Sequence, residues 1–215
     1  MRRATAAIAR DASQGIRRCL GPGMALWALA ALIVVAYGIP SCRGVFDAVE
    51  GARAAGGIWF SIISTALIAG LLPFLLLAAA RRLTMPWPRE LAFSLGFWAW
   101  KGCELDLFYR MQAQWFGEHA GLSTVVLKVV VDQFVFTPLW VTPTGTLVMR
   151  WKNRLPLAGA PRAMAVVLVA NWFVWIPTVS CLYLLPTPLQ MPVCSCVLAF
   201  WALVLGLAAG DARRL

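Results

Sequence analysis

Charge is scarce in this sequence, and acidic charge is scarcest. Only 13% of the 215 residues are charged, and the 19 Lys and Arg residues outnumber the 9 Asp and Glu residues. An average soluble domain is about one quarter charged and roughly half apolar, whereas this chain is 61% hydrophobic. The shortage of charge therefore excludes an ordinary soluble domain, and the composition predicts an integral membrane protein.

The motifs of common catalytic and metal centres are also missing. The chain contains no GxSxG, HExxH, P-loop or GxGxxG pattern. It has a single histidine, His119, and its six cysteines show no CxxC spacing. We therefore do not expect an enzyme, and we expect no cofactor and no bound metal.

The excess of basic residues gives a formal net charge of +10, which in other chains can indicate nucleic-acid binding. Here the basic residues stand between hydrophobic runs, as they do at membrane borders. We therefore expect the lipid bilayer as the partner and no nucleic acid. A homo-oligomer is left open.

Sustained alternation of apolar and polar residues, which marks membrane β-strands, is absent as well. Long apolar runs are present instead, and about 20 such residues suffice for a helix to cross the hydrocarbon core. The sequence thus predicts an all-α, polytopic membrane helix bundle. We expect a basic inner-side tail over residues 1–19, a single transmembrane helical domain over 20–209 and a short inner-side tail over 210–215. The six predicted spans are residues 20–39, 57–80, 91–116, 122–149, 163–185 and 191–209.

The distribution of basic residues predicts the orientation of these spans. If the N-terminus lies inside and all six segments cross, the outer loops hold only Arg43 and Arg53. All other basic residues outside the spans then face inward, as the positive-inside rule requires. This asymmetry breaks if only one of the segments 91–116 and 122–149 crosses. A four-span alternative, in which neither crosses, stays open.

Two predicted spans carry charges of both signs in equal number. A charge at the bilayer centre costs roughly 2.5–3.5 kcal/mol even on the lenient insertion scale, so these groups are expected to pair or to face a wet interior. Spacings of three and four residues bring partners onto one helix face. The predicted pairs are Lys101 with Glu104, Asp106 with Arg110, and Lys128 with Asp132.

Two roles are compatible with these charges. They can line a polar route through the membrane, or they can fix the register of packed helices. In the first role they form one intramembrane polar network together with the amides of Gln133 and Asn171; we expect the Asn171 amide to bridge to another helix. Prolines at positions 73, 138, 143 and 177 interrupt the spans and free backbone carbonyls for other partners.

Two motifs in the second half of the chain resemble a known family. Lys128-x-x-x-Asp132-Gln133 followed by Pro138 resembles a Lys-x-x-x-Asp-Gln…Pro signature. Asn171-Trp172-x-x-Trp175-Ile176-Pro177 resembles an Asn-Trp-x-x-Trp-Pro motif with one residue inserted. Pro186 and Trp201 resemble later positions of the same pattern, although Ala202 replaces an asparagine. The family is that of the twenty-two-kilodalton peroxisomal membrane protein, also called the Mpv-seventeen family.

The resemblance covers roughly residues 91–209 and implies a small multi-span membrane protein. Some members of the family are described as weakly selective channels, and members are usually drawn with four spans. The departures of this sequence from the family's motifs predict a divergent, bacterial branch of the family, located in the cytoplasmic membrane. An Arg- and Ala-rich N-terminus keeps the mitochondrial inner membrane as the alternative. The functions left open are a small-solute or ion channel, a membrane scaffold or assembly protein and, less favoured, a membrane-embedded enzyme.

Overall fold

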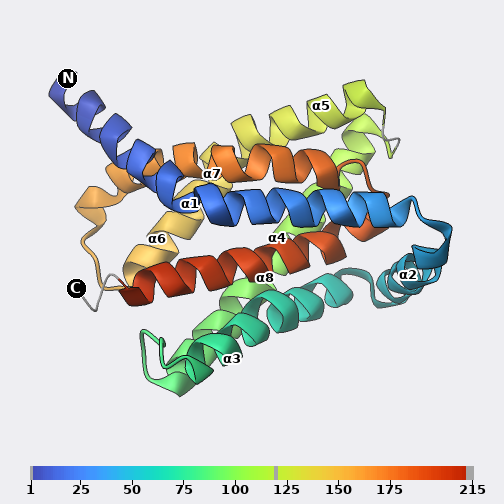
Figure 1. Ribbon diagram of the computed structural model, residues 1–215, viewed down its shortest axis with the longest axis horizontal. Coiled ribbons are helices and arrows are strands. Elements are labelled where there is room, and N and C mark those ends of the chain that lie inside the picture. Colours follow the sequence, from blue (N-terminus) through green and yellow to red (C-terminus); the bar gives the residue numbers. More distant parts are fainter. Residues whose placement is uncertain (1, 119–120, 212–215) are drawn as a thin grey trace. The chain divides into compact units, whose positions relative to one another are not determined.

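The computed structural model describes residues 2–118 and 121–211, with side chains from residue 20 to residue 203 (Figure 1). This described part contains helices and no strands, so the all-α prediction is confirmed. The helices join end to end into six continuous stretches. These are α1 (Arg2–Tyr37); η1 (Pro40–Cys42), α2 (Arg43–Thr65), η2 (Ala66–Leu71) and α3 (Leu72–Ala79); α4 (Trp87–Phe116); α5 (Leu122–Val131), η3 (Asp132–Val141) and α6 (Thr142–Lys152); η4 (Leu157–Gly159) and α7 (Ala160–Leu182); and α8 (Thr187–Asp211).

Four of these stretches contain a segment that is long and apolar enough to cross a membrane. They are Leu20–Tyr37, Pro40–Ala79, Leu122–Lys152 and Leu157–Leu182. Helix α4 has 30 residues, but Lys101, Glu104, Asp106 and Arg110 lower its hydropathy. Helix α8 is apolar over Thr187–Leu203, a shorter part. The predicted fourth span, residues 122–149, thus lies in a stretch that qualifies as a span. The four-span alternative had predicted that this segment does not cross.

The prolines shape two of the stretches into wider turns. Both η2 and η3 are π-helices, and each ends two residues before a proline, Pro73 and Pro143. Proline has no amide proton and its ring crowds the preceding turn, so the chain takes up i→i−5 bonds there. Accordingly, the amide of Thr142 donates to the carbonyl of Thr137. The interruptions that the sequence predicted at Pro73 and Pro143 are therefore π-helical segments.

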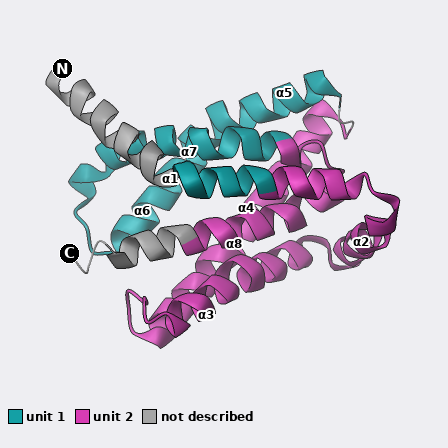
Figure 2. Ribbon diagram, in the orientation of Figure 1, with its two compact units in different colours: residues 1–28, 121–180 teal, residues 29–120, 181–215 magenta. Residues whose placement is uncertain are grey.

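The chain divides into two compact units, which are described separately (Figure 2). In the unit made of Leu29–Ala120 and Cys181–Leu215, the stretch from α2 to α3 packs against α4 and α8. The closest approach is at Gly102, where a Cβ would lie 2.6 Å from the Ser61 carbonyl oxygen and 2.9 Å from Thr65 Oγ1. Small residues allow such contact between membrane helices.

In the unit made of Met1–Ala28 and Gly121–Ser180, α7 contacts both α1 and η3. The Trp27 indole donates to the Val174 carbonyl at 2.9 Å, and the Trp27 and Phe173 rings lie 5.1 Å apart. The expectation that Asn171 bridges to another helix is wrong. Among the described residues its half-buried amide has no hydrogen-bond partner, and the neighbouring Trp172 makes the bridge instead.

The prediction that Arg53 lies in an outer loop is also wrong. Helix α2 begins at Arg43, well before the predicted start of the second span, and Arg53 is buried within it. The alanine-rich stretch before Gly57 favours a helix. Gly57, with φ of 56° and ψ of −138°, bends the stretch instead of ending it. This conformation suits glycine, which has no Cβ to clash.

Candidate functional site

Helix α4 holds Lys101 and Glu104 in a closed ion pair. The Lys101 ammonium donates to both carboxylate oxygens of Glu104, at 2.8 and 3.1 Å. Their side chains are only 7% and 6% exposed, respectively. The ammonium also lies 4.5 Å from the centroid of the Trp100 ring, which adds a cation–π attraction. The pairing predicted from the three-residue spacing is confirmed.

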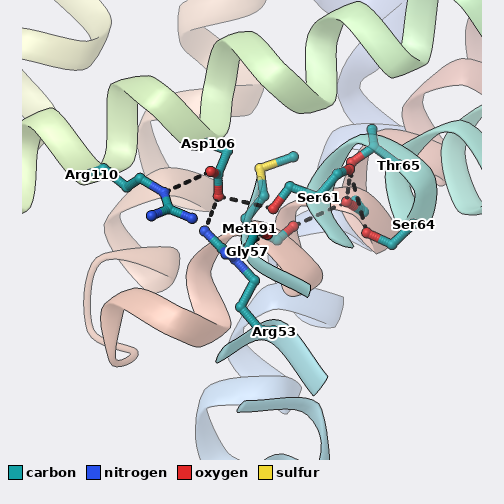
Figure 3. A network of polar contacts seen from close by, with 9 residues as sticks. Arg53, Gly57, Ser61, Ser64, Thr65, Asp106, Arg110 and Met191 are labelled. Carbon is teal, nitrogen blue, oxygen red and sulfur yellow. Dashed lines mark hydrogen bonds and ion pairs between the residues drawn. The ribbon is translucent and has the colours of Figure 1, made fainter. Parts of the chain in front are cut away.

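A second charged group surrounds Asp106. Its Oδ2 accepts a hydrogen bond from Arg110 Nε at 2.8 Å, which confirms the pairing predicted from the four-residue spacing. Its Oδ1 accepts one from Ser61 Oγ at 2.9 Å and one from the Arg53 guanidinium. Figure 3 shows the two arginines approaching the carboxylate from different sides. We call Arg53, Ser61, Asp106 and Arg110 the Asp106 cluster.

Arg53 is the member of the Asp106 cluster that the sequence reasoning missed. Its Nη1 donates to the Gly57 carbonyl at 2.7 Å, so two of its three nitrogens hold it in place. A signal was present in the sequence, because residues 53, 57, 61 and 65 recur every four positions and are all polar or small. In a regular helix that spacing places residues on one face. Gly57 bends the stretch between Arg53 and Ser61, and both of these side chains contact Asp106 of α4.

The third partner changes the charge of the cluster. The sequence predicted that Asp106 and Arg110 would neutralise each other. With Arg53 added, two guanidinium groups share one carboxylate, which leaves one positive charge in excess. Asp106 is 2% exposed, whereas the side chain of Arg110 is 45% exposed. The cluster is therefore a buried carboxylate with one arginine inside and one at the edge.

Hydroxyl groups extend this polar face to α8. Ser195 Oγ donates to the Met191 carbonyl at 3.0 Å, and it lies 2.7 Å from Thr65 Oγ1. Because Ser195 uses its proton on Met191, Thr65 is the donor to Ser195. These contacts satisfy polar groups that would otherwise be costly in an apolar interior.

Tyrosine and glutamine side chains between α4 and α8 form another buried polar contact, which the sequence did not reveal. Gln112 Nε2 donates to the Tyr183 hydroxyl at 2.7 Å. The Tyr109 hydroxyl donates to Cys194 Sγ at 3.4 Å, and its ring meets that of Tyr183 edge-on. These groups fix α4 against the C-terminal part of this unit.

In the other unit, the predicted polar residues gather where α5 passes into the π-helix η3. Lys128, Asp132 and Gln133 are all buried, at 2%, 6% and 2% exposure. Asp132 Oδ1 accepts hydrogen bonds from Gln133 Nε2 at 2.9 Å and from Thr137 Oγ1 at 3.4 Å. Pairing between Lys128 and Asp132 stays a prediction.

The two motifs of the resemblance meet in this unit. In a π-helix the carbonyl of residue 133 is the acceptor for the amide of residue 138, and Pro138 has no amide proton. Trp172 Nε1 donates to this Gln133 carbonyl at 2.6 Å, and its ring lies 5.2 Å from that of Phe134. The indole thus takes the place of the missing amide proton.

The remaining predicted positions have simpler surroundings. Trp175 is buried, and Pro177 is half-buried inside α7. Pro186 comes directly before α8, and its carbonyl accepts the amide of Leu189 at 2.9 Å. Trp201 is half-buried in α8. The polar residues of segments 91–116 and 122–149 belong to different units, so a single network through all of them stays a prediction.

No family model, curated protein or solved structure matches this chain. Within the described residues, no three His, Cys, Asp or Glu side chains are grouped so that they could hold a metal ion. The candidate site consists of charged and hydroxyl groups enclosed between apolar helices.

Proposed function

We propose that the chain is a multi-pass protein that crosses a bacterial cytoplasmic membrane six times, with both termini on the inner side. Four of the six helical stretches qualify as spans by length and hydropathy alone. The ion pairs of α4 support its crossing, because paired charges are far less costly in a bilayer than isolated ones. The basic residues outside the six predicted spans support the orientation, because nearly all of them then lie on the inner side.

The dimensions of α4 support the same placement. Its 30 residues correspond to about 45 Å, close to the thickness of a bilayer with its headgroup regions. Trp87 and Trp115, near its two ends, are both largely exposed, as interfacial tryptophans are. Lys101 and Glu104 then lie close to the bilayer midplane.

We propose that the protein passes small solutes or ions, as some members of the resembling family are described to do. The observation that carries this proposal is the Lys101–Glu104 pair at the middle of α4. Charges at that depth are expensive and commonly mark a pathway for ions or protons. Because the pair is enclosed in the described conformation, passage along this route requires the pair to open.

Conductance of the purified protein in planar bilayers tests this role. We expect channels for the wild type, and a shift toward anions for Glu104→Gln, because Lys101 then keeps its charge without a counterion. Asp106→Asn is expected to shift selectivity in the same direction. Arg89→Gln is the control, since Arg89 is exposed in the first turn of α4, away from both groups. Channels whose conductance and selectivity are the same in all variants would place the route elsewhere.

A second candidate, a membrane scaffold or assembly protein, has its own supporting observation. The Arg53–Asp106 ion pair joins α2 to α4, and Lys101 and Glu104 are almost fully enclosed. Buried pairs of this kind can set the register of packed elements. Absence of any channel from correctly folded protein would favour this role over the first.

A further inference from the structure

The Asp106 cluster has more donors than acceptors. Arg53 donates through Nη1 and Nη2, while its buried Nε has no acceptor among the described residues. Arg110 uses only Nε, so in the described part of the chain its two terminal nitrogens have no partner. The two guanidinium groups also repel each other across Asp106. One anionic group more would balance the charge and fill the open donors.

The depth of Arg110 makes such a group reachable. It lies nine positions beyond Lys101, a rise of about 14 Å along the helix. If Lys101 lies near the midplane, as the proposed function has it, Arg110 stands at the edge of the roughly 30 Å hydrocarbon core. Its side chain is 45% exposed and is long enough to extend into the headgroup layer. The exposed Trp115 lies five residues further on, as expected at an interface.

We propose that the Asp106 cluster is a binding site for an oxyanion of the phosphate class, held by the terminal nitrogens of Arg110. A guanidinium matches two phosphate oxygens with two parallel hydrogen bonds. Asp106 fixes the guanidinium through Nε, and Arg53 adds positive charge behind it. The phosphate can belong to a lipid headgroup or to a free anion, and both present the same chemistry to Arg110.

Thermal unfolding in dodecyl maltoside, a detergent without phosphate, tests the site with two probes. One is short-chain phosphatidylglycerol, compared with diacylglycerol of the same chains; the other is sodium phosphate, compared with sodium chloride at equal ionic strength. At about ten times its dissociation constant, a bound probe should raise the wild-type unfolding temperature by about 3–6 °C. Arg110→Gln should abolish the rise, and Arg110→Lys should keep part of it.

Arg43→Gln is the matched control. Arg43 is an exposed arginine at the start of α2, where it stacks on Tyr37, and it takes no part in the cluster. A rise with phosphatidylglycerol alone identifies a lipid site, and a rise with phosphate identifies a site for a free anion. No rise with either probe, or an equal loss in Arg43→Gln and Arg110→Gln, overturns the proposal. Because the assay is done in detergent, it does not depend on whether the protein conducts.

Discussion

Trp172 donates its indole proton to the backbone carbonyl of Gln133, which Pro138 leaves without its helical donor. The two residues come from the two motifs that suggested a family resemblance. Their contact gives the motifs a shared physical task, because a proline can stand inside a membrane helix only if the freed carbonyl finds another donor. One hydrogen bond between η3 and α7 thus connects the two motifs.

Replacing Trp172 by Phe should destabilise the protein by about 1–3 kcal/mol, because a buried carbonyl then has no donor. Pro138→Ala should rescue it, since alanine restores the amide proton that can bond to the Gln133 carbonyl. The loss caused by Trp172→Phe should therefore be smaller in the Pro138→Ala background. Thermal unfolding of both single variants and the double variant measures this coupling, and strictly additive losses would show that the indole does not act through that carbonyl.

Local features of this fold could be predicted from the sequence, and contacts between distant segments could not. The helical stretches follow from the length of the apolar runs, and the pairs Lys101–Glu104 and Asp106–Arg110 follow from helical spacing alone. Arg53 reaches Asp106 across 53 positions of the chain. Arg53 was assigned to a loop because the apolar run of the second span begins only at residue 57, and the four-residue recurrence that continues through Arg53 does not say which helix it will face.

Gly102 offers a test of how closely α2 and α4 approach. Gly102→Ala places a Cβ within 2.6 Å of the Ser61 carbonyl oxygen, and the helices must separate to accommodate it, at about 1–3 kcal/mol. Gly96→Ala is the matched control on the same helix, because nothing lies within 4 Å of the added Cβ. It should leave stability unchanged or raise it by up to about 1 kcal/mol through better helix propensity. Equal unfolding temperatures for the two variants would contradict the packing described.

Within the Asp106 cluster, the three charged residues should differ in their contribution to stability. Asp106→Leu leaves two arginines without their carboxylate and should destabilise most, by about 3–5 kcal/mol. Arg53→Met should have a smaller effect because Asp106 keeps Arg110 and Ser61 as donors. Arg110→Gln should have the smallest, about 0–1 kcal/mol, since its side chain is half exposed.

The double variant Arg53→Met with Asp106→Leu sharpens this test. It removes the buried arginine together with its carboxylate, so it should unfold at a higher temperature than Asp106→Leu alone. Thermal unfolding in detergent measures all four variants. A double variant that is less stable than either single one would mean that Arg53 and Asp106 do not depend on each other.

Lys128 and Asp132 lie one helical turn apart, and both are buried. If they pair or share a partner, neutralising one leaves a charge in low dielectric at a cost of several kcal/mol. Lys128→Met and Asp132→Leu should therefore each lower expression and thermal stability more than the double variant does. Measured losses that simply add would show that the two charges do not interact.

Six crossings place Glu118 and Lys152 on opposite sides of the membrane, because the stretch from Leu122 to Lys152 then spans it. Single cysteines at these positions, in a background whose six native cysteines are replaced by alanine, can be labelled by a membrane-impermeant maleimide in intact cells. We expect labelling at position 118 from outside and at position 152 only after the membrane is opened. The reason is the distribution of charge, since Lys152 stands among basic residues that the positive-inside rule holds on the inner side. Labelling of both positions from the same side would show that the α5–α6 stretch does not cross, which contradicts the six-span arrangement and favours the four-span one.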